Sequence, residues 1–537
     1  MIHMKYDATE LPDNPESLKR IIADLTAENE QISVENKNLS EKIEHLKEQY
    51  QLLQKRFFGR SSEKLTKEDE AQGILFNEAE EGIETPPDSS NEHDSVITVE
   101  THTRRKAGRK PLSDDLPREE IIYDLTEEEK KCPCCNKERP PIGQEETEEL
   151  DIIPAKIYVI KRIYKKYGAC GCDEFLNAEI PEVKSAPFEK RMIPGSIASS
   201  GLLAFVFTSK FCDALPFYRQ SKMFERIDAD ISRATMCNWV IAAYEKMHLF
   251  FEIFEAHLKS GAFIRMDETI IQVLHEEGRS PQAKSYMWVA IGYPIRGRPL
   301  VLFRYYPTRS GEIPDQFLSG FSGYLQTDGY DGYNRAVRNN DIVHVGCMAH
   351  ARREFNNAYD SGKKNKDSRA FKALAYIQKI YKIESDLRSE NLSDEIFIER
   401  RRKLAAPVLD ELHAWLLRNK AEVLPQSLVG KAISYTLNEW DKLIRYLDLA
   451  CMTPDNNEIE RAIRPFVVGR KNWLFSNTPR GARASAAIYS LIESAKANRL
   501  EPYAYLRFLF SRLPHALDRE SVIKLLPCFL DAYKISD

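Results

Sequence analysis

Long apolar segments are missing from this chain of 537 residues. No run approaches the roughly 20 apolar residues that span a bilayer. The charged N-terminal stretch also lacks the apolar core of a signal peptide. We therefore expect a cytoplasmic protein with no membrane partner.

Cysteine is also scarce, with ten residues in the whole chain. Half of them fall in one short cluster between residues 132 and 172. This clustering indicates a reduced compartment and a bound metal rather than a disulfide framework.

The chain has no excess of positive charge, because its formal net charge is −5. Composition therefore gives no global sign of nucleic-acid binding. The basic residues are instead concentrated in residues 103–110, 156–166 and 461–483, and the acid that balances them lies largely in residues 67–100. Local basic patches of this kind are typical of nucleic-acid contacts.

The N-terminal segment has a seven-residue apolar repeat. Its first seam comprises Leu18, Leu25, Ile32, Leu39, Leu46 and Leu53, and its second comprises Ile22, Asn29, Asn36, Ile43 and Tyr50. Apolar seams with asparagine on one of them favour a parallel pair of helices in fixed register. We predict a coiled coil that makes the protein a homodimer or a higher oligomer. The alternative is a long amphipathic helix packed against its own chain.

An acidic stretch rich in serine follows and is predicted to be a disordered linker. It leads to a basic arm around Gly108-Arg109-Lys110-Pro111. Arginine is attracted into narrow minor grooves of DNA, so the candidate contacts are Arg104, Arg105, Arg109 and Lys110. The alternative is a solvated basic linker.

The cysteine cluster predicts a structural zinc site. Four thiolates in two close pairs can hold a module too small for its own core. The candidate Zn²⁺ ligands are Cys132, Cys135, Cys170 and Cys172. Only one residue separates the second pair, and the alternative is a set of reduced, unliganded cysteines.

Three short helices are expected next, at residues 201–210, 215–226 and 231–240. Ser232 is a good N-cap for the third helix. The spacing suits a helix-turn-helix, whose last helix would offer Arg233, Thr235 and Asn238 to a major groove. Small helical bundles share this pattern.

Four strand-like runs follow between residues 262 and 328, and two of them end on Asp267 and Asp328. Carboxylates at neighbouring strand ends converge and suit Mg²⁺ or Mn²⁺. Two such ions can activate an attacking oxygen and stabilise a leaving one in phosphoryl transfer. Nearby Glu268 and Asp331 are rival ligands, and each acid could equally be a carboxylate without a role.

A third carboxylate is expected after a helical insertion at about residues 356–450. It lies on a helix that starts near Pro454. We select Glu460 over its rival Glu458, since positions two apart on a helix point about 200° from each other. Four basic residues would hold phosphates from the same segment: Arg461, Arg464, Arg470 and Lys471.

Motifs along nearly the whole chain resemble those of the transposases of insertion-sequence family 66. They include Phe57-Phe58-Gly59-Arg60-Ser61-Ser62-Glu63-Lys64, Met266-Asp267-Glu268-Thr269, Gly346-Cys347-Met348-Ala349-His350-Ala351-Arg352-Arg353 and Arg470-Lys471-Asn472-Trp473-Leu474-Phe475. The resemblance implies a ribonuclease-H-like catalytic domain with an Asp-Asp-Glu triad, here Asp267, Asp328 and Glu460. The spacing of Cys170 and Cys172 departs from the two intervening residues expected in this family.

The resulting prediction is a multidomain α+β protein. Its segments are a coiled-coil helix (1–65), an acidic linker and basic arm (66–115), a zinc-binding β module (116–190), a helix-turn-helix region (191–255), a ribonuclease-H-like domain with a helical insertion (256–480) and C-terminal helices (481–537).

We expect a nucleoid-associated DNA transposase that acts on double-stranded element ends and target DNA, together with possible accessory proteins of the same element. The alternatives are a dimeric zinc and helix-turn-helix regulator with an inactive nuclease-like domain, and a plain metal-dependent nuclease.

Overall fold

The structure is a computed structural model that describes residues 14–58, 157–167, 184–295, 297–362 and 364–531. Chain contacts divide it into two compact units, of which one comprises residues 1–75 and 164–537. The predicted zinc ligands Cys132, Cys135, Cys170 and Cys172 lie outside the described residues. So do the predicted basic-arm contacts Arg104, Arg105, Arg109 and Lys110.

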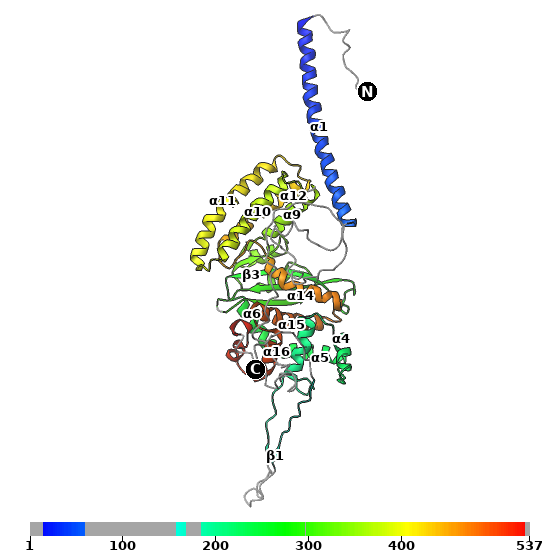
Figure 1. The fold of residues 1–537 in the computed structure, drawn as a ribbon, viewed down its shortest axis with the longest axis vertical. Coiled ribbons are helices and arrows are strands. Elements are labelled where there is room, and N and C mark those ends of the chain that lie inside the picture. Colours follow the sequence, from blue (N-terminus) through cyan, green and yellow to red (C-terminus); the bar gives the residue numbers. More distant parts are fainter. Residues whose placement is uncertain (1–13, 59–156, 168–183, 296, 363, 532–537) are drawn as a thin grey trace, which may run out of the picture. The chain divides into compact units, whose positions relative to one another are not determined.

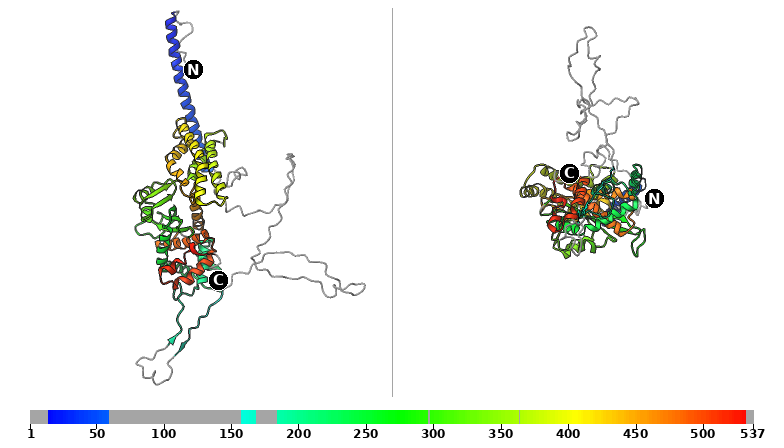
Figure 2. Two further views of the ribbon diagram at one scale, coloured as in Figure 1. Left: turned by 90° about the vertical axis from the view of Figure 1, so that its left-hand side faces the viewer. Right: turned by 90° about the horizontal axis from the view of Figure 1, so that it is seen from below.

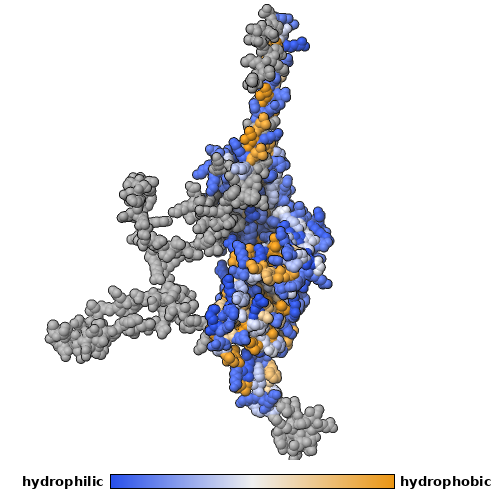
Figure 3. Space-filling view, turned by 90° about the vertical axis from the view of Figure 1, so that its right-hand side faces the viewer, coloured by the Kyte–Doolittle hydropathy of each residue, from blue (hydrophilic) through white to orange (hydrophobic). Residues whose placement is uncertain are grey.

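The N-terminal repeat forms one helix of 44 residues, α1 (Pro15–Phe58). Apolar side chains of both predicted seams are exposed on it, including Ile22, Ile32, Leu39, Ile43 and Leu46. Apolar surface along this helix is visible in the space-filling view (Figure 3). The predicted helix is therefore confirmed, and these five apolar side chains stay exposed in the part of the chain that the structure describes.

The predicted group of three short helices is also present, as α3 (Ser200–Phe211), α4 (Phe217–Glu225) and α5 (Arg233–Lys246). The hydroxyl of Ser232 accepts a hydrogen bond from the amide of Thr235 at 3.1 Å and caps α5, as the sequence predicts. A fourth helix, α6 (His248–Leu258), leads into the sheet. The residues before α3 contain a short antiparallel pair, β1 (Lys166–Tyr167) and β2 (Lys184–Ser185).

A five-stranded mixed sheet follows, with the strand order β5-β4-β3-β6-β7 (Figure 1). The first three strands form an antiparallel meander, whereas β6 and β7 run parallel to β3. Their bounds are β3 (Phe263–Gln272), β4 (Lys284–Gly292), β5 (Leu300–Tyr306), β6 (Gly323–Gln326) and β7 (Ile342–Val345). The short helices α7 (Glu312–Phe317) and α8 (Tyr333–Asn339) lie between the later strands in sequence.

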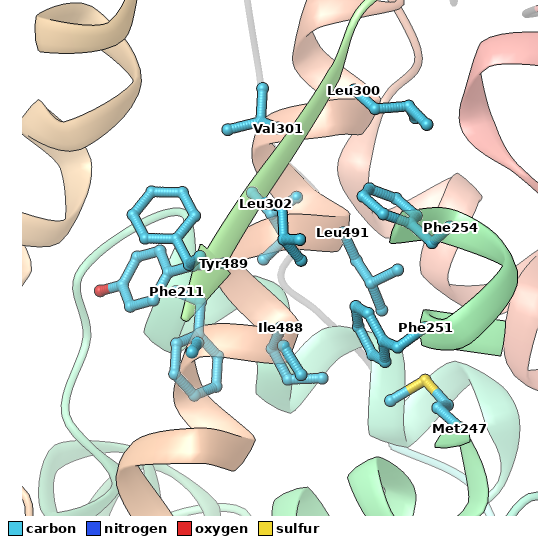
Figure 4. Close-up of a cluster of buried hydrophobic side chains, with 14 of the residues drawn as sticks. Phe211, Met247, Phe251, Phe254, Leu300, Val301, Leu302, Ile488, Tyr489 and Leu491 are labelled. Carbon is cyan, nitrogen blue, oxygen red and sulfur yellow. The ribbon is translucent and has the colours of Figure 1, made fainter. Parts of the chain in front are cut away.

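The open edge of β5 is covered by helix α15 (Pro479–Ala497). Ser490 and Ser494 accept hydrogen bonds from the amides of Phe303 and Val301, each at 2.8 Å. These bonds satisfy edge groups that would otherwise pair with another chain. Figure 4 shows the core beside this edge, where α6, β5 and α15 contribute Phe251, Phe254, Leu302, Ile488 and Leu491. The C-terminal helices α16 (Pro502–Arg512) and α17 (Arg519–Ile523) pack on α3 and α6.

Helices occupy the segment after β7, where the sequence predicts them at about residues 356–450. Its main helices are α9 (Met348–Ser361), α10 (Arg369–Arg388), α11 (Asp394–Lys420) and α12 (Leu428–Asn438). They share a second apolar core that includes Phe355, Ile377, Leu412 and Ile433. Figures 1 and 2 show these helices gathered on one side of the sheet, with α15 and α16 on the other. Within the described ranges, no helix is long and apolar enough to cross a membrane.

After α13 (Trp440–Leu443), the chain returns to the sheet as α14 (Asn457–Trp473). This helix packs on β3 and β4. Its far end reaches the predicted helix-turn-helix region, where the Asn472 amide donates a hydrogen bond to the Ala214 carbonyl at 3.1 Å. The ring of Trp473 lies 5.8 Å from the Lys210 ammonium group of α3. One helix therefore contacts both the sheet and the predicted DNA-binding helices.

Candidate active site

Asp267 lies on β3, and Asp328 lies two residues after the end of the neighbouring strand β6. In the parallel pairing of β3 with β6, Arg265 is opposite Gln326. Each aspartate is two residues further along its chain, so both positions lie just beyond the end of this pairing, and Asp328 affects the Asp267 carboxyl electrostatically. Asp328 follows the end of β6, as expected. The expectation that Asp267 ends its strand is wrong, because β3 continues to Gln272 in antiparallel pairing with β4.

The position of Asp267 is electrostatically unfavourable for a negative charge. Burial raises its pKa well above the usual range, and the neighbouring Glu268 and Asp328 raise it further, with a smaller contribution from Glu460. The backbone amide of Glu268, 2.7 Å from the Asp267 carboxylate, favours the charged form. Concentrated, poorly compensated negative charge of this kind is typical of functional sites.

Glu460 enters the same electrostatic environment from α14. Two contacts of Asn456 hold the start of the helix: its side-chain amide donates to the Met266 carbonyl, and its backbone amide donates to the Cys347 sulfur, each at 3.2 Å. Burial raises the pKa of Glu460, Asp328 raises it slightly, and Arg353, whose guanidinium is 3.7 Å away, lowers it. Asp267, Asp328 and Glu460 therefore influence one another electrostatically.

The rival carboxylates are occupied by other partners. Glu268 accepts hydrogen bonds from the guanidinium of Arg309 and from the Tyr333 hydroxyl, at 2.5 and 2.8 Å. Glu458 accepts a hydrogen bond from the Tyr293 hydroxyl at 2.5 Å and lies 3.4 Å from the Arg265 guanidinium.

Asp331 is the third rival and is exposed. It accepts a hydrogen bond from the Asn334 side chain at 3.2 Å. All three rivals therefore have a local structural partner.

The donor set of Asp267, Asp328 and Glu460 suits a hard divalent cation. All three side chains offer carboxylate oxygens, which Mg²⁺ prefers. A bound cation would offset the mutual repulsion that raises the pKa of Asp267. In the part of the chain that the structure describes, no three His, Cys, Asp or Glu side chains are already arranged at ligand spacing around one point.

Two cationic side chains next to these carboxylates were not predicted from the sequence. Arg309 follows β5 and lies over the Tyr330 ring at 3.8 Å. Arg353 is on α9, and its partner Glu460 is described above. Arg353 belongs to a motif noted in the sequence, so its position there was an available signal. Arg309 stands in a stretch without any motif.

The four basic residues predicted on α14 differ in exposure. Arg461 and Lys471 are exposed, Arg464 is partly buried, and all three are on the surface of the helix. Arg470 is also partly buried, and burial lowers the pKa of its guanidinium. One of its terminal nitrogens is enclosed without a hydrogen-bond partner in the described residues.

On the predicted recognition helix α5, Arg233 and Asn238 are exposed. The Thr235 hydroxyl lies 2.9 Å from that of Ser232, so it takes part in capping the helix. Arg233 and Asn238 are therefore more accessible to a groove than Thr235.

Comparison with known proteins defines the class. A model described as "Transposase IS66 family" matches residues 195–484, which is more than half of the chain. Three further models match in order: "Transposase C of IS166 homeodomain" (45–121), "zinc-finger binding domain of transposase IS66" (129–173) and "IS66 C-terminal element" (490–528). The chain is thus a transposase with a zinc-finger domain. It belongs to the IS66 family of transposases.

Similar full-length proteins occur in Sinorhizobium fredii (strain NBRC 101917 / NGR234). The uncharacterized protein y4jD is 29% identical over 520 residues, which covers 94% of each chain. The uncharacterized protein y4qI is 27% identical over 495 residues, which covers 89% of this chain and 87% of the relative. The resemblance therefore extends over most of the chain rather than over one domain.

Proposed function

We propose that this transposase cleaves DNA at the ends of an insertion sequence and joins the freed ends to target DNA. The observation that carries the proposal is the convergence of Asp267, Asp328 and Glu460 from two adjacent strands and one helix. The strand order, with three antiparallel strands followed by two parallel ones, supports a ribonuclease-H-like domain. Family membership supports divalent-metal use.

The three carboxylates would hold Mg²⁺ or Mn²⁺, which supplies activation of an attacking oxygen and stabilisation of the leaving oxygen. The protein's own residues then orient the phosphodiester. Arg353 and Arg309 are placed beside the acids and would contact the non-bridging phosphate oxygens. No covalent intermediate with the protein is required in this scheme.

DNA would be recognised by several separate segments. Exposed Arg233 and Asn238 on α5 would reach base edges in a major groove. Arg461, Arg464 and Lys471 would contact phosphates near the site. The basic arm and the zinc-finger domain would add contacts from the N-terminal half.

We further propose that α1 pairs with α1 of a second chain, so that two element ends are held together. Its seams expose Ile22, Leu39 and Leu46 by 62%, 54% and 66%, which is unusual for large apolar residues unless a partner covers them. Asn29 and Asn36 on the second seam would set the register of a parallel pair.

The proposed reaction is tested with purified full-length protein, labelled candidate element ends and Mg²⁺. We expect nicked ends and, with added target DNA, joined products. The variant Asp267→Asn should retain binding to the ends and lose both products. Cleavage without joining would indicate a nuclease, and binding without cleavage would indicate the regulator.

A further inference from the structure

We propose that Arg265 is a positioning residue that fixes the relative placement of the three carboxylates. This inference rests on the proposed function, because it concerns the same acids. Arg265 is completely buried, although its guanidinium is charged. It is two residues before Asp267 on β3, and its side chain connects β3 to the two other segments that carry an acid.

The first connection reaches the segment of Asp328. The Arg265 guanidinium donates to the side-chain oxygen of Gln326 at 2.7 Å. Gln326 is the last residue of β6 and precedes Asp328 by two positions. Its amide nitrogen donates in turn to the carbonyls of Gly346 and Thr453, at 3.2 and 2.9 Å. The orientation of Gln326 is therefore fixed on both sides.

The second connection reaches the segment that carries Glu460. The guanidinium donates to the Asp455 carbonyl at 2.8 Å and to the Thr453 hydroxyl at 2.9 Å. The same hydroxyl donates to the Asp455 carbonyl at 2.8 Å. These bonds hold the turn from which α14 begins, five residues before Glu460.

The third nitrogen of the Arg265 guanidinium reaches a tyrosine and a glutamate. Its Nε donates to the Tyr293 hydroxyl at 3.0 Å and lies 3.4 Å from the Glu458 carboxylate. Tyr293 also donates to Glu458 at 2.5 Å. Glu458 therefore supplies counter-charge to the arginine from the first turn of α14.

Only arginine satisfies these partners together. Its planar guanidinium offers donors in several fixed directions, whereas a lysine ammonium is a compact point donor. Burying a charge is costly unless hydrogen bonds satisfy it, and here the partners come from three separate chain segments. An apolar side chain at this buried position would avoid the free-energy cost of burying a charge. The presence of arginine therefore indicates a specific geometric requirement next to the acids.

A second buried arginine provides a comparison within the same chain. Arg401 is also fully buried and donates to Glu384 and to several carbonyls of residues 446–452. Its partners are Glu384 and carbonyls of residues 446–452, the last of which precedes Thr453, and none of them lies on β3 or β6. Arg401 therefore resembles Arg265 in burial and hydrogen bonding but not in location.

The test compares Arg265→Lys with Arg401→Lys and with Leu412→Ala, a destabilised variant in the insertion core. For each full-length protein we would measure the melting temperature, binding to element ends, Mn²⁺ affinity by calorimetry and cleavage. We expect Arg265→Lys to bind DNA normally, to bind Mn²⁺ about 10-fold or more weakly, and to need correspondingly more metal for cleavage. The two controls should lose stability without a change in Mn²⁺ affinity.

Gln326→Met removes the hydrogen bond between Arg265 and β6 and leaves Arg265 itself in place. This variant tests the proposal if Arg265→Lys does not fold. It should weaken Mn²⁺ binding in the same direction, though less. Wild-type Mn²⁺ affinity in Gln326→Met and in any folded Arg265→Lys would overturn the positioning role. Equal loss of Mn²⁺ affinity in Leu412→Ala at the same melting temperature would also overturn it. If Asp267→Asn binds Mn²⁺ like the wild type, the proposed metal site itself is wrong.

Discussion

The roles of Glu458 and Glu460 can be distinguished experimentally because the two side chains have different partners in the structure. Glu458→Gln removes the charge that faces Arg265 at 3.4 Å, while the other hydrogen bonds of Arg265 remain. The Glu458 side chain is 42% exposed, so solvent screening limits the loss to under about 1 kcal/mol of unfolding free energy. If the transition state for cleavage lost the same stabilisation of under about 1 kcal/mol, the cleavage rate would fall about fivefold at most.

Glu460→Gln removes a proposed metal ligand, and a lost stabilisation of about 4 kcal/mol or more corresponds to at least roughly 10³-fold slower cleavage. Unlike Glu458→Gln, Glu460→Gln should not lower the stability of the fold. Burial already raises the pKa of Glu460, and nearby Asp328 opposes its charge, so a neutral amide should leave the melting temperature unchanged or higher.

The assay for both variants is single-turnover cleavage of a labelled end with Mg²⁺, together with a gel shift and a thermal melt. Wild-type binding to the ends is expected in both variants. An inactive Glu458→Gln and an active Glu460→Gln would refute the assignment of the third ligand.

Three further predictions concern other parts of the chain. Removing residues 1–65 should reduce the oligomeric state measured by light scattering, and an unchanged state would refute the coiled-coil pairing. Protein purified without chelator should contain about one zinc per chain by elemental analysis, and Cys132→Ser combined with Cys170→Ser should remove it. His344 should make the fold acid-sensitive, because burial lowers its pKa to about 4 from 6.5. Above pH 6.5 His344 is neutral in both the folded and the unfolded chain, and the unfolding free energy falls by about 3 kcal/mol as the pH is lowered towards 4. His344→Gln should abolish this part of the pH dependence of the melting temperature.

Regular elements were predictable because their signals are local. The seven-residue repeat predicted α1, and Ser232 marked the start of α5. Runs rich in β-branched and aromatic residues predicted β4 and β5 close to their observed bounds, whereas β3 extends five residues beyond its predicted end. Asp267 was predicted as a candidate ligand because an apolar run ends there, although its strand continues for five more residues in pairing with β4.

The positions of Arg265 and Arg309 were not predictable in the same way. A single arginine inside a strand pattern is usually an exposed residue, and only the assembled fold shows that Arg265 is buried against Gln326, Thr453 and Asp455. Arg309 is 41 residues from Glu268 in sequence. Contacts of this kind depend on how β3, β6 and α14 pack against one another, and no local sequence pattern predicts that packing.

Helix α14 mechanically couples two regions that are separate in sequence. It holds Glu460 near its start and Asn472, bonded to Ala214 before α4, near its end. Twelve residues of helix separate the two side chains, which is roughly 18 Å of rise. Adding one residue between them would turn Glu460 by about 100° relative to the docked end. The separation and the angle between the carboxylate and the predicted helix-turn-helix region are therefore set by a single helix, so the spacing of the DNA segments that both would contact is expected to follow its length.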